Sequence, residues 1–106
     1  EKYLNGCQKL PSAFLADNDL LACRAVQAFK RRGIRVPDEV SFVGFDNRPI
    51  CSFIEPKVTT VQLPGNEMGE LAVKALVEKI EKTRGYNVKY KIEPELIENE
   101  SVRKLV

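Results

Sequence analysis

Two short apolar runs, each followed at once by acidic and amide side chains, constrain the fold of this chain more than any other feature. The first covers residues 13–16 and the second residues 40–45. Such runs are typical of strands covered on both faces, as in parallel sheets. Between them, apolar side chains recur at three- and four-residue steps from Leu21 to Phe29, which indicates a helix. Strand, helix and strand with short connections form a right-handed parallel unit, so we predict an α/β fold.

Basic residues gather where this helix should end. They are Lys30, Arg31, Arg32 and Arg35, and Gly33 supplies a helix stop among them. Cations suit the negative end of a helix dipole, so we interpret the cluster as a solvated helix end. A phosphate-binding patch is the alternative.

The second half of the chain adds a strand, a helix and a tail. Residues 58–61 are β-branched and predict a strand, residues 66–83 predict a helix, and residues 89–98 partly alternate, as a strand with one wet face would. The helix carries an apolar stripe formed by Met68, Leu71, Ala72, Ala75, Leu76 and Ile80. Because a wet stripe is unfavourable, we expect it to fold back on the chain's own sheet or to pack on a second chain. We expect residues 99–106 to be loose.

Polar side chains stand at the carboxyl ends of the two strands in the parallel unit. Asn18 and Asp19 follow the first strand, and Asp46 and Asn47 follow the second. Ligands of open parallel sheets bind beyond these ends. A carboxylate that accepts and a carboxamide that also donates suit a polyhydroxylated or heterocyclic ligand. Turns and helix caps use the same residue types, so the spacing alone leaves both interpretations open.

The residue inventory excludes most enzyme chemistry. The 106 residues include no histidine, which removes the usual general base, nucleophile activator and metal ligand. The three cysteines, Cys7, Cys23 and Cys51, are an odd number and lack the spacing of a metal site or a disulfide framework. Cys23 lies on a predicted helix face and fits a small apolar residue of the core or of an interface. We therefore expect a binding protein and not an enzyme, with no cofactor and no metal.

Charge and hydropathy limit the classes of partner that this chain is expected to bind. A formal net charge of +2 gives no reason to expect general binding to nucleic acid or to an acidic membrane surface. No apolar run is long enough to span a membrane, and no signal peptide is evident. Free cysteines then fit a cytoplasmic protein best.

Four strings together carry a family resemblance. They are residues 11–19, residues 35–47, residues 56–61 followed by Met68-Gly69, and residues 94–97 followed by Ser101-Val102. In order and spacing they resemble the lactose-repressor/galactose-repressor (LacI/GalR) family of bacterial transcription regulators. The resemblance implies a fragment of a doubly wound parallel-sheet domain, namely the two-lobed, periplasmic-binding-protein-like effector domain of that family.

The same resemblance implies roles for individual residues. At the matching positions, Asn18 and Asp46 would touch an effector, a sugar or a nucleobase, that sits between the lobes. From the residues alone, Asn18 or Asp17 can cap the start of the helix. Asp19, which opens the helix, is expected to satisfy its free N–H groups as a cap or to support the hinge. Family members dimerise through faces that here would include Leu20, Cys23, Ile50 and Phe53.

The resemblance also divides the chain between the lobes. Residues 1–57 and 86–106 would belong mainly to the C-terminal lobe, and residues 58–85 would supply a hinge strand and a helix of the N-terminal lobe. The helix-turn-helix and most of the first lobe lie outside this sequence, so this homodimer would reach DNA only through a part that is absent here. Residues 63–65 include no aromatic where some relatives stack one on the ligand, so the ligand class stays open.

Other functions remain as alternatives. A solute-binding protein of a sugar transporter shares both strand-end signatures, and a leader peptide in the full gene would favour it. A regulator with a winged-helix head would also fit. From a different class, a phosphoacceptor receiver domain places acids at strand ends, and Asp17 with Asp19 could imitate its magnesium-binding pair. That domain needs a lysine at a further strand end, and no suitable one follows.

Overall fold

A computed structural model describes residues 2–6 and 9–105 of the chain. The chain divides into two compact units. Unit 1 is Glu1–Gln62 with Leu96–Val106, and unit 2 is Leu63–Glu95. Of the predicted free cysteines, Cys7 lies outside the described residues.

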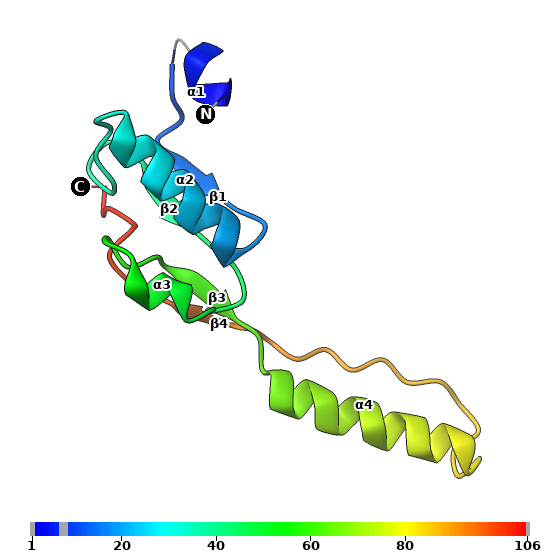
Figure 1. Ribbon diagram of the computed structural model, residues 1–106. Helices are drawn as coiled ribbons and strands as arrows, with labels where there is room; N and C mark the ends of the chain where they lie inside the picture. Colours follow the sequence, from blue (N-terminus) through cyan, green and yellow to red (C-terminus); the bar gives the residue numbers. More distant parts are fainter. Residues whose placement is uncertain (1, 7–8, 106) are drawn as a thin grey trace. The chain divides into compact units, whose positions relative to one another are not determined.

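Unit 1 is built around the predicted strand–helix–strand motif (Figure 1). Strand β1 (Ala13–Leu15) pairs in parallel with β2 (Ser41–Val43), and Phe14 lies opposite Phe42. Helix α2 (Asp19–Arg31) connects them. The α/β class and the parallel pairing predicted from the two apolar runs are therefore confirmed. A short helix, α1 (Lys2–Gly6), precedes the motif.

A third chain segment lies beside β2 and continues the parallel arrangement. Val43 forms a parallel bridge with Thr59, and the Gly44 N–H donates to the Thr59 carbonyl at 2.8 Å. Strand β3 (Thr60–Gln62) follows at once and forms a two-stranded sheet with β4 (Glu95–Ile97). Between β2 and β3 the chain makes a short helix, α3 (Ile50–Phe53).

Three phenylalanine rings occupy the centre of the core of unit 1. Phe42 stacks on Phe14 with ring centroids 5.3 Å apart, and Phe29 of α2 meets Phe42 edge-on at 5.1 Å. Such aromatic pairs stabilise a core by about 0.5–1.5 kcal/mol each beyond the area they bury. The buried apolar residues around them are Ala22, Cys23, Val26, Val40, Cys51 and Val58. These contacts fix α2 on the sheet.

Residues 99–103 are held in place, so the expectation of a loose ending is wrong for this part. Ser101 is fully buried, and its Oγ accepts from the Thr59 N–H at 2.8 Å and donates to the Phe42 carbonyl at 2.5 Å. The Arg103 N–H donates to the Ser41 hydroxyl at 3.0 Å. A short polar side chain thereby connects two neighbouring segments of the sheet.

Unit 2 consists of helix α4 (Gly65–Ile80) and the segment that follows it. No residue of α4 is buried, and the large apolar side chains exposed on it are Met68, Val73, Leu76, Val77 and Ile80. Leu71 and Ala75 are half-buried, so unit 2 by itself covers the apolar stripe only in part. The strand predicted within residues 89–98 is present only as β4, because residues 89–94 have no regular structure. Among the described residues, no helix has the length and apolar character needed to cross a membrane.

Candidate functional site

Asn18 and Asp46 line one hollow in unit 1. Its volume is about 390 Å³, and its other lining residues are Leu20, Arg48, Pro49 and Ile50. Asn18 comes from the end of β1 and Asp46 from the end of β2, and the parallel pairing of these strands brings the two ends to one edge. The structure thus brings together the two residues that the sequence singled out for a ligand.

Asn18 is the N-cap of α2. Its backbone is extended, with φ −155° and ψ 169°, and its Oδ1 accepts from the Leu21 N–H at 3.0 Å. An N-cap residue keeps non-helical dihedrals while its side-chain oxygen binds a free N–H of the first turn. Because the cap uses the carbonyl oxygen, the side-chain NH2 is the group that can donate to a ligand.

Of the predicted caps, Asn18 is the one observed, and Asp19 does not cap α2, because it is already the first helical residue and its side chain points into unit 1. Its expected support of the hinge stays a prediction. The residue is fully buried. Its Oδ2 accepts from the Arg48 N–H at 2.5 Å, and its Oδ1 accepts from the Thr60 hydroxyl at 2.6 Å. Its own N–H donates to the Phe45 carbonyl at 3.0 Å. Asp19 therefore connects the start of α2 with the loop after β2 and with β3.

The loop after β2 has an unusual backbone. Asp46 and Asn47 both have positive φ, 102° and 51°, a region that non-glycine residues rarely adopt. The Asp46 N–H donates to the Val61 carbonyl at 2.8 Å, and the Asn47 N–H donates to the Thr60 hydroxyl at 3.2 Å. The Asp46 residue is exposed at the rim of the hollow. Asn47, unlike Asp46, does not line the hollow, and its side-chain amide donates to the Gln62 side chain at 3.0 Å.

Two buried thiols lie next to the Asp19 carboxylate. Cys23 and Cys51 are each 1% exposed and free. Burial raises the pKa of Cys23, and burial together with a hydrogen bond to Asp19 raises the pKa of Cys51 to about 12. Both thiols stay protonated near neutral pH. Sequence reasoning did not predict that Cys51 would be buried beside Asp19, since nothing in its spacing distinguishes it from the other cysteines.

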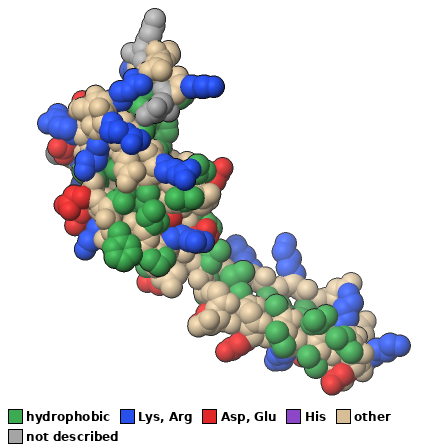
Figure 2. Space-filling model, in the orientation of Figure 1, with side chains coloured by type: hydrophobic (Ala, Val, Ile, Leu, Met, Phe, Trp, Pro, Cys, Tyr) green, Lys and Arg blue, Asp and Glu red, His purple; other side chains and the backbone are tan. Residues whose placement is uncertain are grey.

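The residues proposed for a dimer face divide into two groups. Leu20 is 47% exposed and Phe53 is 84% exposed, and Ile50 is half-buried. Figure 2 shows hydrophobic side chains gathered on the face of unit 1 that carries α2 and α3. Cys23, in contrast, is in the core. The prediction of a small apolar core position is therefore confirmed for Cys23, and its assignment to the dimer face is wrong.

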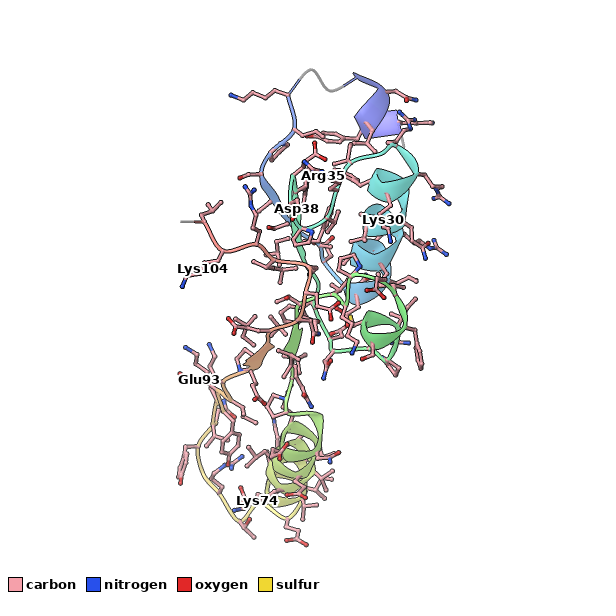
Figure 3. All side chains as sticks on the ribbon, turned by 90° about the vertical axis from the view of Figure 1, so that its left-hand side faces the viewer. Lys30, Arg35, Asp38, Lys74, Glu93 and Lys104 are labelled. Atoms are coloured by element: carbon pink, nitrogen blue, oxygen red, sulfur yellow. The ribbon has the colours of Figure 1, made fainter. Side chains whose placement is uncertain are left out.

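The basic cluster makes local contacts. Lys30 (labelled in Figure 3) donates from Nζ to the Glu55 carbonyl at 2.7 Å, and Arg35 pairs with Glu39 at 3.1 Å. Arg32 donates to the Asn5 side chain at 2.6 Å. These contacts favour the interpretation as a solvated helix end. Within the described part of the chain, no three His, Cys, Asp or Glu side chains gather as metal ligands.

Comparisons with known proteins show the family to which this chain belongs. The sequence matches the periplasmic binding protein-like domain over residues 2–102. It is 30% identical over 95 residues to the HTH-type transcriptional repressor PurR of Photobacterium profundum, covering 90% of this chain and 28% of that protein. The chain thus spans less than a third of the length of this curated relative.

Solved structures agree. A LacI-type transcription regulator from Bifidobacterium animalis subsp. lactis is 35% identical with a TM-score of 0.77, over 88% of this chain and 33% of that one. The transcriptional regulator CelR in complex with cellobiose is 31% identical with a TM-score of 0.80, over 85% of this chain and 28% of that one. This chain belongs to the family of periplasmic binding protein-like domains and corresponds to the C-terminal part of the effector-binding domain in LacI-type regulators.

Proposed function

We propose that this chain is the effector-sensing and dimerisation part of a bacterial transcriptional regulator that responds to a sugar or a nucleobase. The observation that carries the proposal is the meeting of Asn18 and Asp46 at one hollow. The Asp46 carboxylate accepts hydrogen bonds, and the free NH2 of Asn18 donates them. Vicinal hydroxyls of a sugar, or the ring N–H and carbonyl groups of a base, present the complementary pattern.

Relatives support this choice of class. PurR is named a transcriptional repressor, and the CelR structure holds cellobiose. The match over residues 2–102 favours a regulator over the phosphoacceptor domain, which has a different fold signature. A sugar-transport solute-binding protein shares the fold, but the relatives named above are regulators. On the proposed function the chain is not an enzyme, and it acts in the cytoplasm.

The hollow in unit 1 is half of the proposed pocket. Residues 1–57 and 86–106 would form mainly the C-terminal lobe, and residues 58–85 would contribute to the N-terminal lobe, with the effector between them. Two hydrogen bonds, one of them to a charged group, contribute roughly 2–5 kcal/mol. Association costs roughly 4–15 kcal/mol. This chain without the rest of the N-terminal lobe is therefore expected not to bind its effector measurably.

The whole protein would work as an allosteric switch. Effector binding would bias the angle between the lobes, and a homodimer would pass that bias to DNA-binding heads outside this chain. The exposed side chains of Leu20 and Phe53, with the half-buried Ile50, are the candidates for the dimer contact.

The test is titration calorimetry of the full-length protein with cellobiose, lactose, hypoxanthine and guanine. We expect one probe to bind, and Asp46→Ala to weaken it by at least about tenfold, because a hydrogen bond to a charged group is lost. DNA binding of the Asp46→Ala protein in the absence of the probe should match that of the wild type. Loss of DNA binding in this variant would instead assign Asp46 a structural role.

A further inference from the structure

We propose that Asp19 is the positioning residue of the effector pocket: its buried carboxylate sets where Asp46 stands relative to Asn18. The inference rests on the proposed function, since it concerns the same pocket. Asp19 does not line the hollow itself. It acts through the backbone of the loop that does.

The carboxylate lies where three chain segments converge. Its Oδ2 holds the Arg48 N–H of the loop after β2 at 2.5 Å, and its Oδ1 holds the Thr60 hydroxyl of β3 at 2.6 Å. Cys51 of α3 also forms a side-chain hydrogen bond with it. These donors are neutral. A buried carboxylate is unfavourable unless hydrogen bonds satisfy it. One of the hydrogen bonds that this carboxylate receives comes from Arg48, a residue that lines the hollow.

Thr60 extends this hydrogen-bond network from Arg48 to the neighbouring residue, Asn47. Its hydroxyl donates to Asp19 and accepts from the Asn47 N–H at 3.2 Å. Donation to Asp19 directs the hydroxyl proton away from Asn47, so the oxygen lone pairs face the Asn47 N–H. The carboxylate thus orders the N–H groups of both residues that follow Asp46.

These hydrogen bonds explain how the loop after β2 keeps its conformation. Asp46 has φ 102° and Asn47 has φ 51°, both in the left-handed region, which costs on the order of 1–3 kcal/mol per residue where side chains are present. Such a conformation persists only where the surroundings over-determine it. Here the N–H groups of Asp46, Asn47 and Arg48 are each engaged, by Val61, Thr60 and Asp19 respectively.

Asp19 also fixes the other side of the pocket. It directly follows Asn18, and its N–H donates to the Phe45 carbonyl at 3.0 Å. One residue therefore ties the capping residue to the end of β2 through its backbone and to Arg48 through its side chain. An asparagine here would keep the shape but would offer a single acceptor oxygen to two donors.

The experiment compares Asp19→Asn with Ser101→Ala in the full-length protein. Both residues are fully buried, and both accept a hydrogen bond from a backbone N–H. The donor to Asp19 is Arg48 of the loop after β2, whereas the donor to Ser101 is Thr59, which is not in that loop. Thr60→Val and Thr60→Ser form a second pair, since serine keeps the hydroxyl. The readouts are amide hydrogen exchange at Asn47 and Arg48, and the Kd for cellobiose and lactose.

We expect Asp19→Asn and Thr60→Val to speed exchange at Asn47 or Arg48 by at least about tenfold and to weaken sugar binding by a similar factor. Ser101→Ala and Thr60→Ser should leave both readouts near the wild-type values. Equal exchange at Asn47 and Arg48 in Asp19→Asn and Ser101→Ala would overturn the inference, as would faster exchange with unchanged sugar affinity. If the wild type binds neither sugar, the sugar form of the proposed function fails, and the exchange data alone decide the positioning role.

Discussion

A Cβ atom on Gly44 would lie 2.3 Å from Oδ1 of Asp19 and 3.2 Å from its Cα. The backbone at the end of β2 therefore lies so close to the buried carboxylate that only glycine fits at this position. The close approach is what allows Asp19 to reach both the loop after β2 and Thr60. The first prediction concerns this contact.

Gly44→Ala should destabilise unit 1 by about 1–3 kcal/mol, because the added methyl group meets a carboxylate that has no free space. The measurement is urea unfolding followed by circular dichroism. Gly69→Ala is the control, since a Cβ at Gly69 meets nothing within 4 Å and alanine favours a helix interior. Equal stability of the wild type and Gly44→Ala would show that the carboxylate can move aside.

Substitutions of Asn18 should separate its two roles. Asn18→Ala removes the cap and should lower the free energy of unfolding by about 0.5–2 kcal/mol. Asn18→Asp keeps an acceptor for the Leu21 N–H and should retain the stability, but it lacks the NH2 donor. In the full-length protein we therefore expect Asn18→Asp to lose effector affinity, as judged by calorimetry. Normal effector binding by the Asn18→Asp variant would leave Asn18 with the cap alone.

The Cys51 thiol should make stability depend on pH in the alkaline range. Its pKa in the folded chain is about 12, above the ordinary value of 9.0, so the folded state holds its proton more tightly than the unfolded state. The resulting stabilisation is complete below pH 9.0 and is lost as pH rises toward about 12. Urea unfolding over this range should show a shallower decline in Cys51→Ala. An identical decline in both proteins would contradict the prediction.

The exposed stripe of α4 should cause this chain to self-associate. Leu76 is 58% exposed and Ile80 is 70% exposed, and apolar residues that gather on one helix face tend to find a partner. We expect the sedimentation coefficient of the wild-type chain to rise with concentration. Leu76→Glu should suppress that rise, while the control Lys74→Glu, an exposed position outside the stripe, should not. A concentration-independent monomer would mean that the stripe tolerates water.

The parts of the fold that follow from periodicity could be predicted from sequence. Two apolar runs around a helix give β1, α2 and β2, and the parallel pairing then brings Asn18 and Asp46 to one edge. Their strand-end positions were enough to single them out. Whether they bind a ligand stays a prediction.

The role of Asp19 could not be predicted in this way. An acidic residue at a helix start fits a cap equally well, and only the placement of Thr60, 41 residues away in the chain, shows why it is buried. Ser101 is a similar case, because a serine in a polar tail carries no sign that it will bind Thr59 and Phe42. Buried polar networks depend on long-range contacts that no local pattern encodes.

The capping contact of Asn18, together with its proposed contact with the effector, would limit how this pocket can evolve. A change of effector normally proceeds by exchanging the side chains that face it, yet any replacement at this position must still supply an oxygen to the Leu21 N–H. Asp and Ser meet that need about as well as Asn does, and Thr somewhat less well. Selection for a new ligand would therefore act more freely through Arg48, which lines the hollow, does not cap the helix and is not a candidate for the dimer contact.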